Sequence, residues 1–390
     1  MSKRAVIVGW SHIPFGKLDD PDTESLMARV SGAALDHAGV SPEAVDGIYA
    51  GVMNSGFQKQ DFQAALVALA DPSLAHVPAT RLENACATGS AALYAAMDFI
   101  EAGRGRVALV VGAEKMTARS TEDTGDILLN ASYRKEEATL PGGFAGVFSR
   151  IATAYFERHG DHGEALARIA AKNHANALDN PYAQIRKDLG FEFCNTVSDR
   201  NPYVAAPLRR TDCSPISDGA AALVLADAET AAGLRRAIGF RARRHVNDFL
   251  PLSRRDPIAF EGAARAWREA LADAGATLDD LSLVETHDCF TIAELIEYEA
   301  MGLAPRGHGA RALREGWVQK GGRLPINPSG GLKAKGHPVG ATGVSQHVMA
   351  CLQLAGEAGA MQVPDATLAG VFNMGGAAVA NYVSILERVK

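Results

Sequence analysis

Two segments far apart in the chain begin with the same tripeptide, and each half also contains a glycine with small residues that leads into an apolar run. Ala87-Thr88-Gly89 begins one helix-like segment, and Ala341-Thr342-Gly343 begins another. Later in each half, small residues with a glycine lead into an apolar run, at 218–226 and at 375–386. Helix starts rich in small residues are common, so chance is the alternative. The shared order of both features nevertheless predicts an internal duplication with a period near half the chain.

Strands and helices alternate through most of the sequence, and the valine-rich run at 107–112 is typical of a strand buried on both faces. Apolar spacing predicts strands at 5–9, 45–52, 107–112 and 283–286 and helices at 25–38, 260–274 and 291–301. This alternation indicates an α/β fold with a parallel sheet.

The alternation breaks between Thr117 and Thr211. Strand-like runs are scarce there, and helical segments at 147–158 and 163–177 lie between polar loops. An inserted, mostly helical lid fits this pattern. His159 and His162 lie in one of its loops, but they have no third ligand of fitting spacing, so we expect solvated residues and not a metal site.

Charge and hydropathy exclude several classes of partner. The chain has 390 residues, of which 47% are hydrophobic, and 39 basic against 45 acidic residues give a net charge of −6. Nothing in this balance favours nucleic acid or an anionic membrane. No run approaches the roughly 18 apolar residues of a membrane span, and no secretory signal precedes the first strand. We therefore expect a cytoplasmic enzyme.

The five cysteines are an odd number, widely separated and without a Cys-x-x-Cys pair, so we expect free thiols and neither disulfides nor a zinc site.

Cys86 lies just before the helix-like segment at 91–103, where unpaired N–H groups and the helix dipole favour a thiolate. Thr88 or Ser90 can cap that helix. The alternative, at this point equally weighted, is a small cysteine buried for packing.

Two loops in the second half carry further reactive side chains. His287 and Cys289 follow the strand at 283–286, at the edge where open α/β sheets place their chemistry. A glycine-rich loop at 327–343 contains His337 before Pro338. That loop lacks the spacing of a phosphate-binding motif, so nucleotide binding is a weak alternative.

Together these motifs resemble the thiolase superfamily over nearly the whole chain. The matching segments are Asn-Ala-Cys-Ala-Thr-Gly-Ser at 84–90, Ser-Asp-Gly-Ala-Ala-Ala at 217–222, His-Asp-Cys-Phe at 287–290, Gly-His-Pro at 336–338 and the terminal Gly-Gly-Ala-Ala strand. The resemblance implies an α/β thiolase fold with duplicated βαβαβ halves in a five-layered α-β-α-β-α arrangement and an inserted loop domain. It implies a first half at 1–116 completed by 212–246, a lid at 117–211 and a second half at 247–390.

Two departures from the family's usual pattern narrow the resemblance. Most thiolases carry a Cys-x-Gly loop near the end, but here that place reads Asn373-Met374-Gly375. The usual Asn-Glu-Ala-Phe loop is replaced by the His-Asp-Cys-Phe loop. This combination resembles the sterol-carrier-protein type of thiolase and its bacterial acetyl-CoA acetyltransferase-like relatives. A cysteine lost from one loop is thus compensated by one gained on another.

The resemblance implies cleavage of a 3-oxoacyl-CoA by coenzyme A, or the reverse Claisen condensation. Cys86 would be the nucleophile, activated by His337, and Cys289 the acid and base. His287 and His337 would hold the enolate oxygen, and the N–H groups of Cys86 and Gly375 the tetrahedral oxyanion. Ser214 would contact pantetheine.

Coenzyme A and acyl-CoA are expected as substrates, with no permanently bound cofactor and no metal. A homodimer or a tetramer is expected by resemblance. Five arginines could meet the CoA phosphates, although a solvated basic face is the favoured interpretation; they are Arg235, Arg236, Arg241, Arg243 and Arg244.

Two other functions stay open at this stage. Thiolase-like carbon–carbon lyases, such as steroid side-chain retro-aldolases, resemble this type of thiolase but lack the nucleophilic cysteine. A non-catalytic acyl-CoA-binding subunit is the other. Because Cys86 is present, transfer through an acyl-enzyme is favoured.

Overall fold

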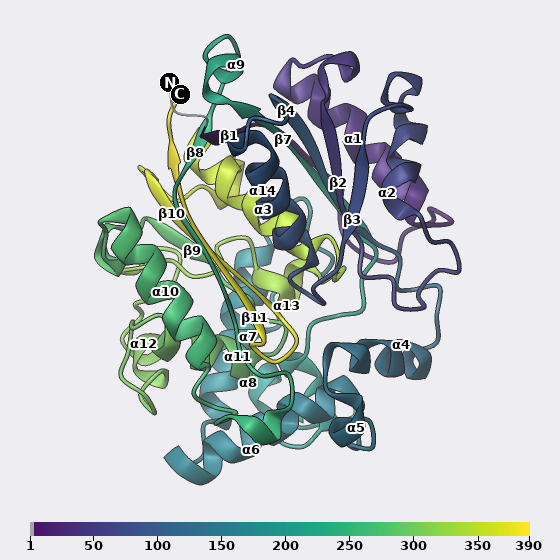
Figure 1. Ribbon diagram of the computed structural model, residues 1–390. Coiled ribbons are helices and arrows are strands. Elements are labelled where there is room, and N and C mark those ends of the chain that lie inside the picture. The colour runs from purple at the N-terminus through teal and green to yellow at the C-terminus, as the bar shows by residue number, and fades with distance from the viewer. Residues whose placement is uncertain (1–3) are drawn as a thin grey trace.

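The computed structural model describes residues 4–390, and its main body consists of two similar halves (Figure 1). The first half contains β1 (Ala5–His12), α1 (Thr23–Ala38), β2 (Gly47–Gly51), α2 (Gln63–Leu66), β3 (Ala79–Leu82), α3 (Thr88–Glu101), β4 (Val107–Glu114) and, after an insertion, β7 (Gly219–Asp227) and α9 (Ala228–Ala232). The second contains β8 (Ile238–Asn247), α10 (Glu261–Ala274), β9 (Leu283–Glu285), α11 (Thr291–Ala300), α12 (Ala310–Arg314), α13 (Gly331–Lys335), α14 (Thr342–Ala355), β10 (Leu368–Gly375) and β11 (Ala380–Arg388).

The strands of the main body form one sheet in the order β3-β2-β4-β7-β1-β8-β11-β10-β9. Strands β2, β3 and β4 are parallel, whereas β7 is antiparallel to both β4 and β1. In the second half, β9 and β10 are parallel and β11 is antiparallel to β10 and β8. The expectation of a parallel sheet is therefore wrong, and the sheet is mixed. The tight turn between β10 and β11 joins them directly, which only antiparallel neighbours allow.

Each half repeats the same strand order outward from the junction of β1 with β8. The first half reads β1-β7-β4-β2-β3, and the second reads β8-β11-β10-β9, with Ile326 bridging in parallel to Val284 where a fifth strand would lie. The two half-sheets pair with each other at Val6–Gly239 and Ile7–Ile238 of β1 and β8. This repeat of order and direction confirms the predicted duplication.

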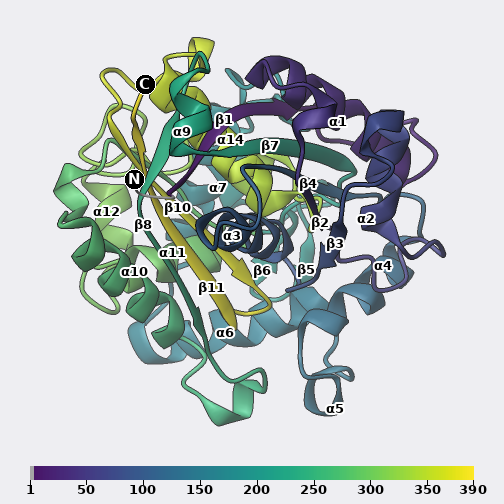
Figure 2. The same cartoon turned by 45° about the horizontal axis from the view of Figure 1, so that its top comes forward.

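Helices form three layers around the two half-sheets. α3 and α14 lie next to each other between the half-sheets, α1 covers the outer face of the first and α10 that of the second (Figures 1 and 2). Valine, leucine and alanine side chains of β1, β4 and β7 alternate between α1 on one face and the central helices on the other. The predicted five-layered arrangement is confirmed.

The repeated Ala-Thr-Gly motif has a packing role where the two central helices begin. A side chain at Gly89 would lie 2.7 Å from the backbone nitrogen of Val344 and 3.0 Å from that of Gly343. A side chain at Gly343 would collide with the backbone nitrogen of Ser90. The two helix starts therefore touch through glycines, and this contact brings the loops before both helices together.

The insertion is mostly helical, as predicted. It contains α4 (Thr121–Leu128), α5 (Arg134–Glu137), α6 (Phe144–His159), α7 (Gly163–Ala177), α8 (Gly190–Asn195) and a hairpin of β5 (Tyr203–Ala205) and β6 (Leu208–Arg209). These helices gather at one end of the half-sheets (Figure 1). Among residues 4–390, no helix combines the length and the apolar character that a membrane crossing requires.

Strand pairing refines two boundaries. β8 pairs with β11 from Ile238 to Asn247, so it belongs to the second half-sheet, although the segment 212–246 would assign it to the first. The division into a lid at 117–211 and two halves otherwise stays a proposal. The terminal Gly-Gly-Ala-Ala segment is a turn and not the start of a strand, because Gly376 and Ala378 have positive φ of 62° and 57°.

Candidate active site

Cys86 lies in the tight turn that connects β3 to α3. Ala85, just before it, has a φ of 50°, which a non-glycine residue adopts rarely. The N–H of Ala87 closes the turn on the carbonyl of Asn84 at 3.0 Å. Such strained backbone persists only where its surroundings enforce it, and it occurs often at functional sites.

The predicted cap of this helix is wrong. The N-cap residue of α3 is Ala87, which has no side-chain cap. Thr88 Oγ1 instead accepts a hydrogen bond from the N–H of Asn84 at 2.8 Å, and the Ser90 hydroxyl points to a different strand. The Thr88 hydroxyl thus stabilises the turn that contains Cys86. The first N–H groups of α3 have no side-chain cap.

Cys86, His287 and His337 converge at the base of the lid. The Cys86 sulfur and one ring nitrogen of each histidine lie within 4.8 Å of one another, and all three residues are buried. The two imidazole rings are 5.1 Å apart and nearly perpendicular. Three loops that are distant in sequence thus deliver three reactive side chains to one point.

The hydrogen bonds of His337 establish which ring nitrogen carries the proton. Nδ1 lies 2.7 Å from Thr342 Oγ1, and that hydroxyl donates to the carbonyl of Pro338 at 2.9 Å. Because the hydroxyl proton is used, Thr342 accepts from an N–H at Nδ1. Nε2 then carries a lone pair, and it is buried without a partner among the described residues. His337 is therefore poised as a base.

His287 has the opposite arrangement. The Asn373 amide donates to Nδ1 of His287 at 3.0 Å and to the carbonyl of Cys86 at 3.1 Å, while its oxygen accepts from the Ser90 hydroxyl at 2.7 Å. Nδ1 of His287 is therefore an acceptor, and Nε2 carries the proton. That Nε2 is also buried without a partner in the described part of the chain. His287 is poised as a donor.

The Cys86–His337 pair is neutral at rest. Burial raises the pKa of the Cys86 thiol to about 12 and lowers the pKa of His337 to about 3. The helix start favours the thiolate, as expected, but the effect of desolvation on the pKa of the Cys86 thiol is larger.

Backbone N–H groups face the Cys86 sulfur. Hydrogen bonds from the N–H of Gly376 and from that of Cys86 itself lower the pKa of the thiol against the effect of burial. The predicted donor, Gly375, is one residue earlier at the end of β10, and a side chain there would collide with the carbonyl of Asn84. The turn after β10 thus presents the N–H of Gly376 to the sulfur, and the role of Gly375 as the oxyanion donor that the family resemblance implies stays a prediction.

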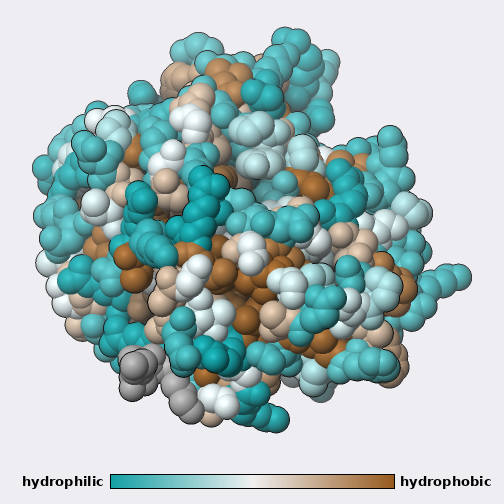
Figure 3. Space-filling view, turned by 90° about the horizontal axis from the view of Figure 1, so that it is seen from above, coloured by the Kyte–Doolittle hydropathy of each residue, from teal (hydrophilic) through white to brown (hydrophobic). Residues whose placement is uncertain are grey.

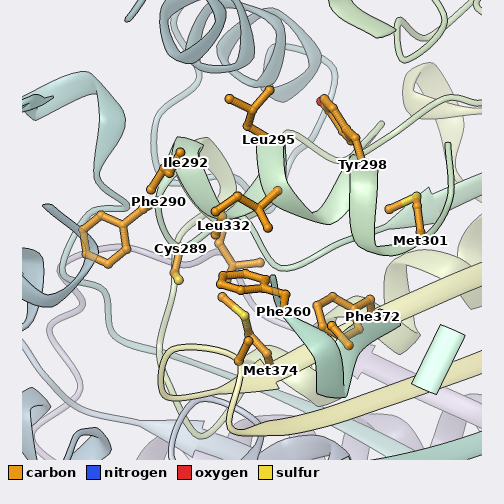
Figure 4. Close-up of a cluster of buried hydrophobic side chains, with 14 of the residues drawn as sticks. Phe260, Cys289, Phe290, Ile292, Leu295, Tyr298, Met301, Leu332, Phe372 and Met374 are labelled. Carbon is orange, nitrogen blue, oxygen red and sulfur yellow. The ribbon is translucent and has the colours of Figure 1, made fainter. Parts of the chain in front are cut away.

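Cys289 borders the same cavity as Cys86 and is 2% exposed. Burial raises the pKa of its thiol well above the usual range, with a further contribution from the nearby Cys86. Figure 4 shows Cys289 beside Phe290 at one end of a cluster of buried apolar side chains. Ser214 donates its backbone N–H to the carbonyl of Cys289 at 2.9 Å and borders the cavity.

Two buried carboxylates that the sequence analysis missed hold the loops in place. Asp288 accepts the N–H groups of Leu332 at 2.6 Å and of Lys333 at 3.1 Å, which ties the Cys289 loop to the His337 loop. Glu114, at the end of β4, accepts three N–H groups, including that of Gly340 at 3.1 Å. An acidic residue directly after a buried strand was the available signal for Glu114.

The lid encloses a cavity of about 730 Å³ above these residues. Cys86, Cys289, His337 and Ser214 border its base, and apolar lid residues such as Leu128 form much of its wall. An elongated, largely apolar ligand fits such a space.

None of the five arginines singled out earlier borders this cavity. Three of them are engaged at short range on the body of the protein: Arg236 with Glu357, Arg243 with Asp98 and Arg244 with Asp273. The spacing of Cys86, His287 and His337 would suit a soft metal ion, but a protonated Nε2 on His287 is not a ligand. The hydrogen bonds therefore favour acid–base chemistry over metal binding.

Comparison with known proteins gives the family. The profile of the thiolase N-terminal domain matches residues 5–229, and that of the thiolase C-terminal domain-like family matches residues 246–388. An acetyl-CoA acetyltransferase of Methanothermobacter thermautotrophicus is 35% identical over 98% of this chain and 99% of its own length. Human sterol carrier protein 2 is 35% identical over the matched region. That region covers 77% of this chain and 56% of the human protein.

Solved structures share the fold at lower identity. The Ltp2-ChsH2(DUF35) aldolase has a TM-score of 0.83 at 21% identity over 99% of this chain and 98% of its own. An acetyl-CoA acetyltransferase from Syntrophomonas wolfei has a TM-score of 0.72 at 19% identity over 99% of both chains. With both domain profiles matched in order along most of its length, the chain belongs to the thiolase family.

Proposed function

We propose that this protein is a thiolase-type acyltransferase that cleaves a 3-oxoacyl-CoA with coenzyme A, or runs the reverse Claisen condensation, through an acyl-enzyme on Cys86. The observation that carries this proposal is the pair of unpartnered Nε2 atoms with opposite protonation, a base on His337 and a donor on His287, beside the Cys86 sulfur. Nucleophilic attack and enolate stabilisation need these two groups.

In the first step, the Cys86 sulfur attacks the ketone carbon. Its proton passes to Nε2 of His337, which becomes an imidazolium. The N–H groups of Cys86 and Gly375 would stabilise the oxyanion on that carbon, and the N–H of Gly376, which faces the sulfur, would stabilise the thiolate as it forms.

In the second step, the carbon–carbon bond next to the former ketone breaks. The acyl group stays on Cys86, and the electron pair leaves as the enolate of a CoA thioester. Nε2–H of His287, together with the protonated His337, stabilises the enolate oxygen. The Cys289 thiol then protonates the enolate carbon and becomes a thiolate.

In the third step, the second coenzyme A gives its thiol proton to the Cys289 thiolate and attacks the acyl group. Cys86 leaves and recovers its proton from His337. Both cysteines and both histidines return to their resting states, and no permanently bound cofactor is needed.

Family relationship supports the substrate class. Relatives named acetyl-CoA acetyltransferase match the chain over nearly its full length, which favours CoA thioesters as substrates. Ser214 borders the cavity and is positioned to contact the pantetheine arm. We assign the protein to acyl-CoA chemistry of lipid metabolism in the cytoplasm.

A homodimer, or a tetramer built from two, fits the surface. Hydrophobic side chains gather near the middle of the face in Figure 3, with hydrophilic residues around them. An apolar patch with a polar rim is typical of an interface between protein chains. Light scattering coupled to size exclusion should give a mass of at least twice 41.0 kDa, whereas a monomer would contradict this part of the proposal.

The lyase alternative rests on the fold shared with the Ltp2-ChsH2(DUF35) aldolase. A retro-aldol cleavage needs a base and an enolate site but no nucleophilic cysteine, so it would survive Cys86→Ala. A pure acyl-CoA-binding subunit would bind CoA esters without turning them over.

Kinetic separation of the two cysteines tests the proposal. Cys289→Ala should still form an acyl-enzyme from an activated thioester, but it should lose thiolysis of 3-oxoacyl-CoA. Cys86→Ala should lose both reactions. Wild-type thiolysis by Cys289→Ala would refute its role as acid, and undiminished cleavage by Cys86→Ala would establish the lyase.

A further inference from the structure

Lys333 differs from the other buried lysines of this protein. Lys115, Lys172 and Lys335 are each at most 6% exposed, and their ammonium groups bind Asp218 at 2.8 Å, Glu294 at 2.9 Å and Ser345 at 2.7 Å, respectively. Lys333 is 3% exposed, yet within residues 4–390 its ammonium has no hydrogen bond and no carboxylate within 4.0 Å. An unpaired buried cation is costly unless a ligand supplies the partner.

The Lys333 side chain borders the cavity above Cys86 and Cys289. Its backbone N–H donates to Asp288, the neighbour of Cys289, and it lies on α13, four residues before His337. Because the side chain is buried, its ammonium lies inside the cavity, on the side of Cys213, and not at the exposed rim.

His174 of α7 borders the cavity as well and is 1% exposed. Neither of its ring nitrogens makes a well-aligned hydrogen bond among the described residues, although the backbone of Lys187 lies close enough to raise the pKa of the ring against the effect of burial. Burial, with the positive charge of Lys333 as a further cause, lowers the pKa of His174 to about 3, so the ring is neutral and can donate one N–H. Lys333 is thus the buried donor of this wall that lacks an acceptor among the described residues, and the neutral His174 ring lies near it.

The ionisable side chains that line the cavity are basic, apart from the cysteines. They are His174, Arg200, Arg210, Lys333 and His337. No aspartate or glutamate borders the cavity. Arg200 and Arg210 are exposed and suit the rim, where the CoA phosphates would meet solvent.

We propose that Lys333 binds a carboxylate on the acyl group, so that the enzyme acts on acyl-CoA esters whose acyl chain carries a free carboxyl group. The reasoning rests on the proposed function. The pantetheine arm that joins the thioester to the phosphates is uncharged, so an anion near Lys333, deep in the cavity, belongs to the acyl part. A charge-assisted hydrogen bond to a desolvated ammonium is among the stronger polar contacts in proteins.

Binding measurements on Cys86→Ala test this without any chemistry. Calorimetry compares linear saturated acyl-CoA esters of matched chain length that end either in a methyl group or in a carboxylate. We expect the carboxylate ester to bind about tenfold more tightly or better at the preferred length. In Cys86→Ala/Lys333→Met this preference should vanish, while Cys86→Ala/Lys135→Met, which removes an exposed lysine of the lid, should keep it.

Three outcomes would overturn the inference. Equal or weaker binding of the carboxylate esters at every length would exclude a carboxylate site. An equal loss of affinity for both esters and for free CoA in the Lys333→Met variant would assign the ammonium to the CoA phosphates. A lower unfolding midpoint of unliganded Lys333→Met would mean that the ammonium already has a stabilising partner, whereas we expect an equal or higher midpoint.

The proposed function can fail separately. Failure to form an acyl adduct on Cys86 of the wild-type protein would remove the transferase mechanism, but the binding preference for carboxylate esters would still be measured. Conversely, adduct formation with loss of the carboxylate preference would leave the mechanism in place and remove only the substrate class.

Discussion

Replacing Asn373 by leucine removes three buried hydrogen bonds at the centre of the site. The amide contacts the Ser90 hydroxyl at 2.7 Å, Nδ1 of His287 at 3.0 Å and the carbonyl of Cys86 at 3.1 Å. Leucine has a similar size but offers no donor, so Nδ1 of His287 can take up the proton that now lies on Nε2. The enolate would then lose its donor.

The expected loss follows from the cost of an unmade hydrogen bond. Leaving a buried polar group unsatisfied costs about 1–3 kcal/mol, and about 1.4 kcal/mol corresponds to a tenfold change in rate. We therefore expect kcat/KM for thiolysis to fall about tenfold to hundredfold in Asn373→Leu. Acylation of Cys86 by an activated thioester should fall less, because that step forms no enolate.

Ser90→Ala is the matched control, since it removes one partner of Asn373 but leaves the bond to His287 in place. Steady-state thiolysis and single-turnover acylation are measured on both variants after circular dichroism has established that they fold. If folded Asn373→Leu loses no more thiolysis activity than Ser90→Ala, Asn373 does not position His287 and the tautomer argument is wrong.

Three further predictions concern packing, charge and the resting thiol. Gly343→Ala places a methyl group against the backbone of Ser90, so we expect a loss of about 1–3 kcal/mol in the free energy of unfolding, measured with denaturant; an unchanged midpoint would contradict the close contact. Burial raises the pKa of Glu114 from 4.5 to about 7. The stability that this carboxyl contributes is therefore present below about pH 4.5 and lost as the pH rises through about 7. The free energy of unfolding of Glu114→Gln, relative to that of the wild type, should therefore increase as the pH rises from about 4.5 to about 7. A difference that does not change with pH would contradict the raised pKa of Glu114. Because the pKa of the Cys86 thiol is about 12, its alkylation rate should rise through the alkaline range; a plateau near neutral pH would indicate a thiolate–imidazolium pair instead.

The fold could be predicted largely because its signals are local and repeated. Periodic apolar residues predicted α1 and the helix at 163–177, whose observed bounds are Gly163–Ala177. The order of Ala-Thr-Gly and Gly-Ala-Ala segments predicted the duplication. Strand direction was wrong because apolar runs carry no information on which neighbour a strand pairs with. The boundary after residue 246 separates most of β8 from the half-sheet with which it pairs, because strand pairing cannot be inferred from an apolar run alone.

The site was predicted as a set of residues but not as a set of protonation states. Cys86, His287, Cys289 and His337 lie on recognisable motifs; the structure places Cys86, Cys289 and His337 on one cavity and His287 beside Cys86 and His337. Their tautomers and pKa values depend on partners from distant strands and loops, such as Asn373, and on burial, which spacing does not reveal. The approach of the Gly376 N–H to the Cys86 sulfur likewise depends on the positive φ of the turn.

The measurement that tests the central claim most directly is the intact mass of the wild-type protein after brief incubation with acetyl-CoA, acetoacetyl-CoA and longer 3-oxoacyl-CoA esters, followed by peptide mapping. The account predicts one acyl group per chain, located on Cys86 and absent from Cys86→Ala. Turnover of a 3-oxoacyl-CoA without any adduct on Cys86, or with undiminished cleavage in Cys86→Ala, would contradict it.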